Sequence, residues 1–128
     1  MGAKGADTLA SAVGQCTSLV HLDLSFNKID GQAAGKVTDQ LRHCQNLAVL
    51  KLRENQIGSV GAGLVADALA SSTALTHLDM GANHSESESG NASLRTLFET
   101  STCIRRLNLM KDRANGGWGP ILARGQLR

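Results

Sequence analysis

The most informative feature of this 128-residue chain is an eleven-residue pattern that recurs at a nearly constant spacing. The pattern begins at Leu19, returns after 28 residues at Leu47, after another 28 at Leu75 and after 29 at Ile104. Each copy has apolar residues at its first, fourth and sixth positions, and the first three copies have Asn at the ninth. A fixed period of this length predicts a solenoid, in which each repeat packs only against its neighbours.

The spacing of apolar residues inside each copy predicts a short strand. Leu22 and Leu24 are two residues apart, so both side chains point to the same side of a strand. The same arrangement recurs in the other copies at Leu50 with Leu52, Leu78 with Met80, and Leu107 with Leu109. We therefore expect strands near 20–24, 48–52, 76–80 and 105–109, stacked in register over one apolar core.

An Asn follows each of the first three predicted strands, where the chain must turn away from the sheet, at Asn27, Asn55 and Asn83. An Asn side chain can donate to and accept from backbone groups that a turn leaves unpaired. The pattern therefore predicts buried, structural Asn side chains. The fourth copy has Asp112 at this position, which lacks the donors, so its turn should be looser.

The segments between the strands predict helices. Apolar pairs four residues apart, such as Val37 with Leu41 and Val65 with Leu69, are typical of a helix with one buried face. The predicted helices lie near 5–14, 33–43, 60–71, 91–101 and 119–127, and Pro120 falls in the first turn of the last one. Small residues near the helix starts, which should let neighbouring helices approach, are Gly5, Ala33, Gly61 and Ser89.

The two ends of the predicted array lack covering structure. The first helix has no strand before it, and the last helix stops at Arg128. Terminal repeats normally carry a polar outer face. Either the chain is part of a longer array, or its uncapped ends self-associate.

These repeats resemble the ribonuclease-inhibitor-like subclass of leucine-rich repeats, which has repeats of about 28–29 residues, Asn at the ninth position and a full helix. The resemblance covers essentially the whole chain and is weaker in the third copy, where Ser85 replaces the apolar residue held by Ile29 and Ile57. It implies a right-handed α/β leucine-rich-repeat solenoid, a horseshoe segment with a parallel concave sheet and convex helices. Residues 1–128 then form a single domain of about four strand-helix repeats plus an N-terminal partial repeat.

The resemblance also carries expectations about function. The subclass includes ribonuclease inhibitors, Ran GTPase-activating proteins and the sensing regions of NOD-like receptors. It implies a non-catalytic, cytoplasmic protein-binding scaffold, as a segment of a larger receptor or regulator, whose partner is another protein. Two alternatives stay open: a regulator resembling Ran GTPase-activating proteins, and an uncapped fragment without independent function.

Composition argues against several other partners. Aromatic residues make up only 2% of the chain, which argues against a stacking surface for single-stranded nucleic acid. The net charge of +2 is too small to indicate a polyphosphate partner. The sequence has no apolar run of transmembrane length and no signal-peptide pattern. We expect a soluble chain that binds neither nucleic acid nor membrane.

The three cysteines are predicted to be structural thiols. Cys16 and Cys44 occupy equivalent places in adjacent repeats, but neighbouring helices pack about 8–10 Å apart. A disulfide needs Cα atoms within about 7 Å, so buried thiols that fill the gap after each helix are favoured over a bridge. Neither these two nor Cys103 belongs to a Cys-x-x-Cys pair, so we expect no structural zinc and no cofactor.

A catalytic site is not favoured either. His21 with Asp23, and His77 with Asp79, lie on one face of a strand, where a carboxylate could orient an imidazole. The repeat places no nucleophile beside them except Ser25, and an open trough offers no enclosed pocket. Val49 lies between the two histidines in the ladder, which also argues against a two-His metal site.

The outward-facing strand positions are the candidate binding residues. In-register stacking, with neighbours about 4.8 Å apart, predicts three rows: Asp23, Lys51, Asp79 and Asn108; His21, Val49, His77 and Arg106; and Ser25, Arg53, Gly81 and Met110. These rows either form a solvated ladder that keeps the strands in register, or bind a protein. In the second case Arg53, Arg106 and Met110 are the expected contacts, because Arg and Met are enriched in interfaces.

An acidic, Ser-rich stretch at residues 85–91 interrupts the third repeat and predicts a solvated, mobile loop. Ser85, with Glu88 three residues later, resembles an acidophilic kinase site, where phosphate would add negative charge. The sequons at Asn83 and Asn91 are interpreted as chance matches, since Asn83 is the turn Asn of its repeat.

Overall fold

The computed structural model describes residues 2–83, 88–109 and 121–123. The helices are α1 (Ala3–Gln15), α2 (Gly31–Gln40), a 3-10 turn η1 (Leu41–His43), α3 (Gly58–Leu69) and α4 (Glu88–Thr100). The strands are β1 (His21–Asp23), β2 (Val49–Lys51), β3 (His77–Asp79), β4 (Arg106–Asn108) and β5 (Ile121–Ala123).

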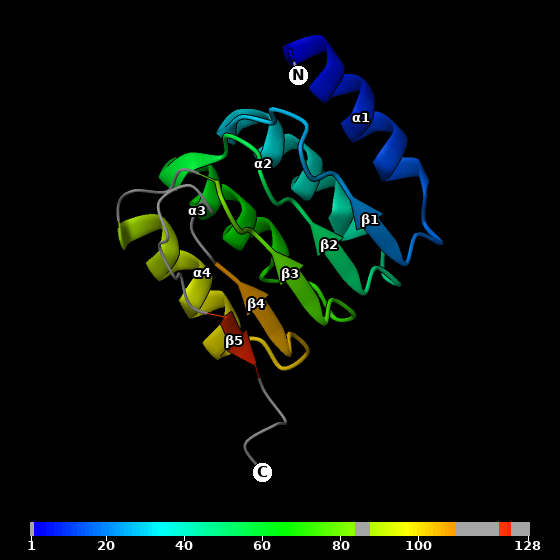
Figure 1. The fold of residues 1–128 in the computed structure, drawn as a ribbon. Helices are drawn as coiled ribbons and strands as arrows, with labels where there is room; N and C mark the ends of the chain where they lie inside the picture. Colours follow the sequence, from blue (N-terminus) through cyan, green and yellow to red (C-terminus); the bar gives the residue numbers. More distant parts are fainter. Residues whose placement is uncertain (1, 84–87, 110–120, 124–128) are drawn as a thin grey trace.

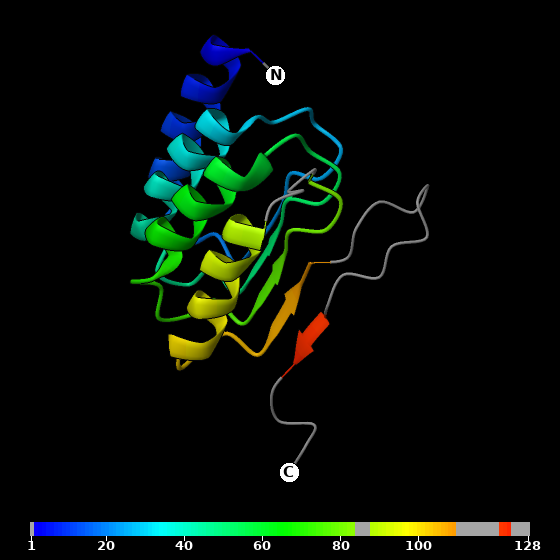
Figure 2. The ribbon, with the colours of Figure 1, turned by 90° about the vertical axis from the view of Figure 1, so that its left-hand side faces the viewer.

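The strands form one sheet in the order β1-β2-β3-β4-β5 (Figure 1). Strands β1 to β4 are parallel and share one register, so that Leu22, Leu50, Leu78 and Leu107 are aligned. Helices α1 to α4 pack side by side on one face of the sheet (Figure 2). The predicted fold class, an α/β solenoid with a parallel sheet on one side and helices on the other, is confirmed.

The core lies between these two layers. Leu50, Leu78 and Leu107 on the strands are at most 1% exposed, and they pack with helix residues such as Val37 and Val65. Each repeat thus completes the burial of the one before it. The equivalent Leu22 in the first repeat is only partly buried. It has a neighbouring repeat on only one side in the described structure.

Short-range signals set where the helices begin. The Asp30 side chain caps α2, because its Oδ1 accepts a hydrogen bond from the backbone N–H of Ala33 at 2.8 Å. Gly58 begins α3 with φ of 68°, a backbone conformation that glycine adopts without strain. Helix α4 begins at Glu88.

Asn55 connects two consecutive repeats through its side-chain amide. Its Oδ1 accepts from the backbone N–H groups of Asn27 at 2.9 Å and Ile29 at 3.0 Å. Its Nδ2 donates to the backbone carbonyls of Leu24 at 3.0 Å and Leu52 at 2.9 Å. The side chain is 2% exposed, so the amide replaces water for backbone groups that the turn leaves unpaired.

The other two Asn side chains differ from this arrangement. Asn83 is buried and donates to the Leu52 and Met80 carbonyls, but its Oδ1 has no hydrogen-bond partner among the described atoms. Asn27 is exposed, so the prediction of a buried side chain is wrong there. The reason is that no described repeat covers the outer side of the first turn. The turn at Asp112 lies outside the described residues.

The prediction of a last helix near 119–127 is wrong. Ile121–Ala123 instead form β5, which pairs antiparallel with β4 and aligns Leu122 with Leu107. An unpaired edge of β4 would expose backbone N–H and C=O groups, and a strand satisfies them. An antiparallel return needs no crossover helix. The β4 edge is therefore paired by the chain itself, contrary to the expected uncapped C-terminal end.

The predicted loop at 85–91 also needs correction, because residues from Glu88 onward belong to α4. Helical hydrogen bonding extends the helix three residues beyond the predicted start at 91. Ser85 lies outside the described residues. At the sequon of Asn83, the side chain is 6% exposed and its Nδ2 donates to the Leu52 carbonyl, so it serves the turn of its repeat.

The burial of each cysteine depends on its position in the row of repeats. Cys44 is buried, and its Sγ donates to the carbonyls of Val13 and Cys16, both at 3.3 Å. Burial, and to a lesser degree the neighbouring Cys16, raises the pKa of the Cys44 thiol. Cys16 is exposed, which corrects the prediction of a buried thiol, because no described repeat covers the outer side of the first helix. Cys103 is half-buried, and its Sγ donates to the Ser72 carbonyl.

In the parts of the chain that the structure describes, no helix is long and apolar enough to cross a membrane.

Candidate functional site on the concave face

The strand register brings the predicted binding residues together on the side of the sheet that faces away from the helices. We name three rows by their order along the strands. The first row is His21, Val49, His77 and Arg106, and the middle row is Asp23, Lys51, Asp79 and Asn108. The third row contains Ser25, Arg53 and Gly81, while Met110 lies outside the described residues.

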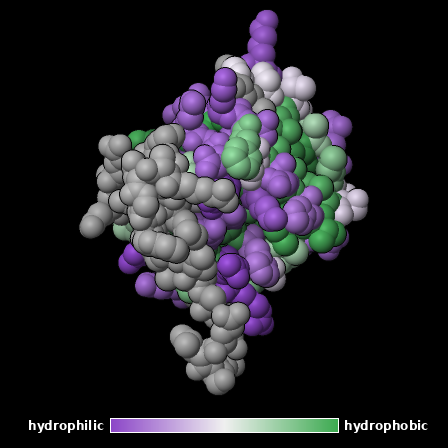
Figure 3. Space-filling view, in the orientation of Figure 1, coloured by the Kyte–Doolittle hydropathy of each residue, from purple (hydrophilic) through white to green (hydrophobic). Residues whose placement is uncertain are grey.

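A shallow depression of about 430 Å³ runs across strands β1 to β4 on this face. It is lined by the first row, by Lys51, Asp79 and Asn108 of the middle row, and by Leu50 and Leu78, while Asp23 lies outside it. Figure 3 views the molecule from the sheet side, and hydrophilic atoms dominate the middle of that view. The face therefore presents polar and charged groups at the fixed spacing of the strands.

Backbone hydrogen bonds hold the two carboxylates of the middle row. Asp23 Oδ1 accepts from the N–H of Ser25 at 3.0 Å, and Asp79 Oδ1 accepts from the N–H of Gly81 at 2.9 Å. The same two-residue turn thus orients both carboxylates relative to the sheet. Hydrogen bonds from the Ser25 backbone and side chain lower the pKa of Asp23. Partial burial opposes this, and the charge of Lys51 adds a smaller lowering of the pKa.

Lys51 lies between these two carboxylates and is half-buried. Among the described residues it forms no ion pair, and the ion pairs that occur there join Lys36 to Asp7 and Arg42 to Asp39 on the helical side. The middle row therefore alternates negative, positive and negative charge without closing into salt bridges.

The arrangement does not assemble a catalytic pair. No hydrogen bond joins His21 to Asp23, or His77 to Asp79, within the described structure, and Nδ1 of His77 instead contacts Oγ1 of Thr76 at 2.8 Å. The backbone register confirms that Val49 separates the two histidines. No group of three His, Cys, Asp or Glu side chains able to hold a metal occurs in the described ranges.

Two exposed apolar residues of the first repeat were missed by the sequence analysis. Phe26 is 72% exposed and Val20 is 54% exposed. Phe26 has φ of 62°, a strained value for a bulky residue, and Glu54 and Ala82 have similar φ at the equivalent positions. An aromatic residue at a repeat position that elsewhere holds Glu, Ala or Lys is the signal that could have identified Phe26.

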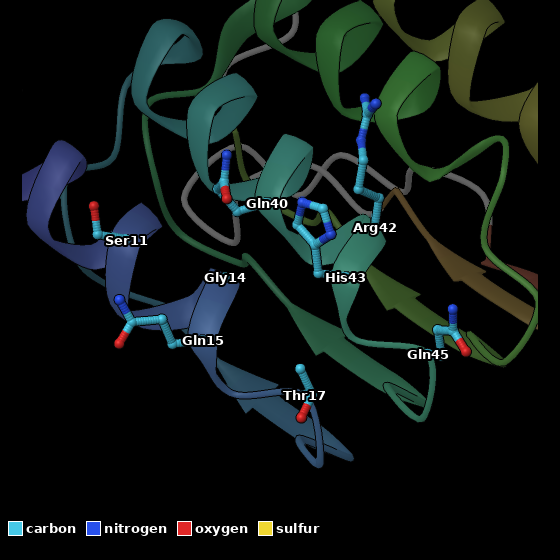
Figure 4. A pocket seen from close by; sticks show the side chains of 8 residues that line it. All are labelled: Ser11, Gly14, Gln15, Thr17, Gln40, Arg42, His43 and Gln45. Carbon is cyan, nitrogen blue, oxygen red and sulfur yellow. The ribbon is translucent and has the colours of Figure 1, made fainter.

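A second depression, of about 540 Å³, lies where α1 and η1 end (Figure 4). It is lined by Ser11, Gly14, Gln15, Thr17, Gln40, Arg42, His43 and Gln45. Most of these are exposed polar side chains, and Arg42 points away from Gln15 and Thr17 in Figure 4. The depression lacks the regular, hydrogen-bonded carboxylates of the sheet face, so the sheet face is the stronger candidate site.

Comparison with known proteins agrees with this geometry. The sequence matches the Leucine Rich repeat family over residues 15–36 and 43–66, which contain the first two copies of the pattern. These two segments match leucine-rich repeats. Beyond them, β3 and β4 continue the same strand register. No curated protein matches the sequence significantly.

The leucine-rich-repeat fold is also similar to a solved structure, the actin-binding site 2 of leiomodin-1. The TM-score is 0.76 at 18% sequence identity, and the match covers 90% of this chain and 67% of that chain. At this identity the similarity shows the fold alone.

Proposed function

We propose that this chain is a non-catalytic protein-binding scaffold that contacts its partner with the first, middle and third rows of the concave face. The observation that carries the proposal is the depression across β1 to β4, in which side chains from four consecutive repeats line one continuous surface. An open surface of this kind suits a macromolecular partner better than a small substrate, since small ligands are usually enclosed in a deeper cleft.

The residue types on this face support the proposal. Arg106 is exposed and Arg53 is half-buried, and Arg is enriched where proteins bind one another. Phe26 adds a large apolar group beside the third row, and exposed aromatic side chains are frequent binding anchors. A binding role also accounts for keeping a strained, solvent-exposed Phe in this turn.

The similar structure adds one further point of support. That structure is an actin-binding site, so a protein with this fold binds another protein. With 18% identity, we carry over the class of partner and not actin itself. The ribonuclease-inhibitor-like subclass is part of the proposal, on the basis of the 28-residue period and the helix in each described return segment. No specific observation favours a GTPase-activating role.

A paired substitution tests the use of the concave face. A partner is first captured by affinity purification and identified by mass spectrometry. The double variant Lys51→Glu/Arg53→Glu should then lower partner affinity at least tenfold, with unchanged circular dichroism. The inward residues of that strand, Leu50 and Leu52, are untouched, so the fold should persist. The control Asp67→Lys changes an exposed residue of α3 on the helical side.

The control should bind as tightly as the natural chain. A concave double variant that binds normally, together with an Asp67→Lys variant that does not, would mean that the partner docks on the helices.

A further inference from the structure

We propose that the concave face, used as a binding surface as argued above, receives an α-helix whose basic, acidic and basic side chains lie opposite Asp23, Lys51 and Asp79. The inference names the partner's local structure and charge pattern. It rests on the proposed function and adds to it.

The spacing of the middle row favours a helix over an extended segment. Strands lie about 4.8 Å apart, so Asp23 and Asp79 are separated by about 10 Å with Lys51 midway. A helix rises about 1.5 Å per residue, so residues i, i+4 and i+7 lie on one face at about 0, 6 and 10.5 Å. Same-face residues of an extended strand lie at about 0, 6.6 and 13.2 Å, so the third falls about 3.6 Å beyond the row, whereas the third helical position is within about 1 Å of it.

The shape of the face agrees with this orientation. The depression is lined by residues of β1, β2, β3 and β4, so an elongated element lying across the strands would contact all four repeats. Figure 1 shows these four strands side by side. The wall of the depression includes the half-buried Val49, which lies beside Lys51 on the same strand and offers an apolar contact for the same helix.

The charges of the middle row are oriented before any partner arrives. Both carboxylates accept a backbone hydrogen bond, from Ser25 and from Gly81, so their side chains lose little freedom on binding. Lys51 forms no ion pair among the described residues and so needs no bond broken to meet an acidic group. An Asp carboxylate is ionised at neutral pH, and the lowered pKa of Asp23 extends its negative charge to more acidic solutions.

A display library of helical peptides tests the inference directly. Positions i, i+4 and i+7 of one surface are varied among Lys, Glu and Gln, and the library is selected on the whole chain. We expect Lys-Glu-Lys peptides to be enriched at least tenfold over Glu-Lys-Glu peptides. The charge-reversed variant Asp23→Lys/Lys51→Glu/Asp79→Lys should enrich the opposite pattern.

A milder variant guards against loss of folding in the reversed one. Asp23→Asn/Asp79→Asn retains an oxygen that can accept from Ser25 and Gly81 while it removes both charges. It should lose the preference for Lys at i and i+7 but keep the preference for Glu at i+4, which depends on Lys51.

The outcomes separate the inference from the proposed function. Enrichment without a charge pattern, a preference for Lys at i and i+7 that survives in the Asn variant, or no enriched helical peptide would each overturn the helix inference. Enriched peptides that bind the Lys51→Glu/Arg53→Glu variant normally and fail on Asp67→Lys would overturn the concave-face proposal itself.

Discussion

A Cβ atom on Gly61 would lie 2.5 Å from the Cα atom of Gly31, so helices α2 and α3 meet where neither residue has a side chain. A Cβ on Gly31 would in turn lie 2.7 Å from the carbonyl oxygen of Ile57. Backbone atoms of packed helices cannot move aside as the end of a flexible side chain can. The spacing of these two helices is therefore set by the absence of side chains.

Gly61→Ala should destabilise the protein, although Ala favours helices over Gly by about 1 kcal/mol. Overpacking at this contact should cost about 1–3 kcal/mol of unfolding free energy, measured by urea denaturation. The matched control is Gly63→Ala in the same helix, where the new Cβ would meet only Ser93 Oγ at 3.9 Å. That variant should be neutral or more stable by up to about 1 kcal/mol. Equal stability of the two variants would show that the contact can relax.

Asn55→Ala should lower the unfolding free energy by about 1–3 kcal/mol, because it removes the acceptor of the Asn27 and Ile29 N–H groups and one of two side-chain donors to the Leu24 and Leu52 carbonyls. Thermal denaturation followed by circular dichroism measures the effect. Asn27→Ala is the control in an exposed turn, and it should cost less than about 1 kcal/mol because water can replace the lost bonds. A larger loss at Asn27 than at Asn55 would contradict this account of the turns.

Phe26→Asn should stabilise the chain by about 1 kcal/mol, because Asn tolerates positive φ far better than Phe and no buried contact is lost. The same substitution should weaken partner binding, since it removes the exposed aromatic group. Melting temperature and partner affinity are measured on the same preparation. A variant that gains stability and keeps full affinity would remove Phe26 from the proposed surface.

Cys16 should be alkylated by iodoacetamide well before Cys44 in the native chain. Cys16 is exposed, whereas burial both shields Cys44 and raises its pKa, which lowers the fraction of reactive thiolate at pH 8. Peptide mass spectrometry after timed quenching gives the two rates. Unfolding in urea should make them similar, and similar rates in the native chain would argue against the burial of Cys44.

Some features of the candidate site could be predicted from the repeat period, and others could not. The period places His21, Val49, His77 and Arg106 at equivalent positions, and strands stacked in one register align them. The binding role of these rows stays a prediction. The turn hydrogen bonds that orient Asp23 and Asp79, and the exposure of Phe26, depend on backbone angles that the residue pattern does not specify.

The sequence by itself determined the repeat architecture. Leu22 and Leu24 point to one side because successive strand residues alternate, and the period places Asn27, Asn55 and Asn83 where each repeat turns away from the sheet. The tertiary structure alone decided the features that depend on which strand, helix or repeat packs alongside. Residues 121–123 have apolar character that suits a helix or a strand, and the unpaired backbone of β4 selects the strand. Gly31 and Gly61 lie thirty positions apart, two more than the period, because adjacent helices touch at an offset that packing sets. Asn27, Cys16 and Leu22 repeat the local pattern of Asn55, Cys44 and Leu50 yet stay exposed or half-covered, because burial in a solenoid is supplied by the adjoining repeat.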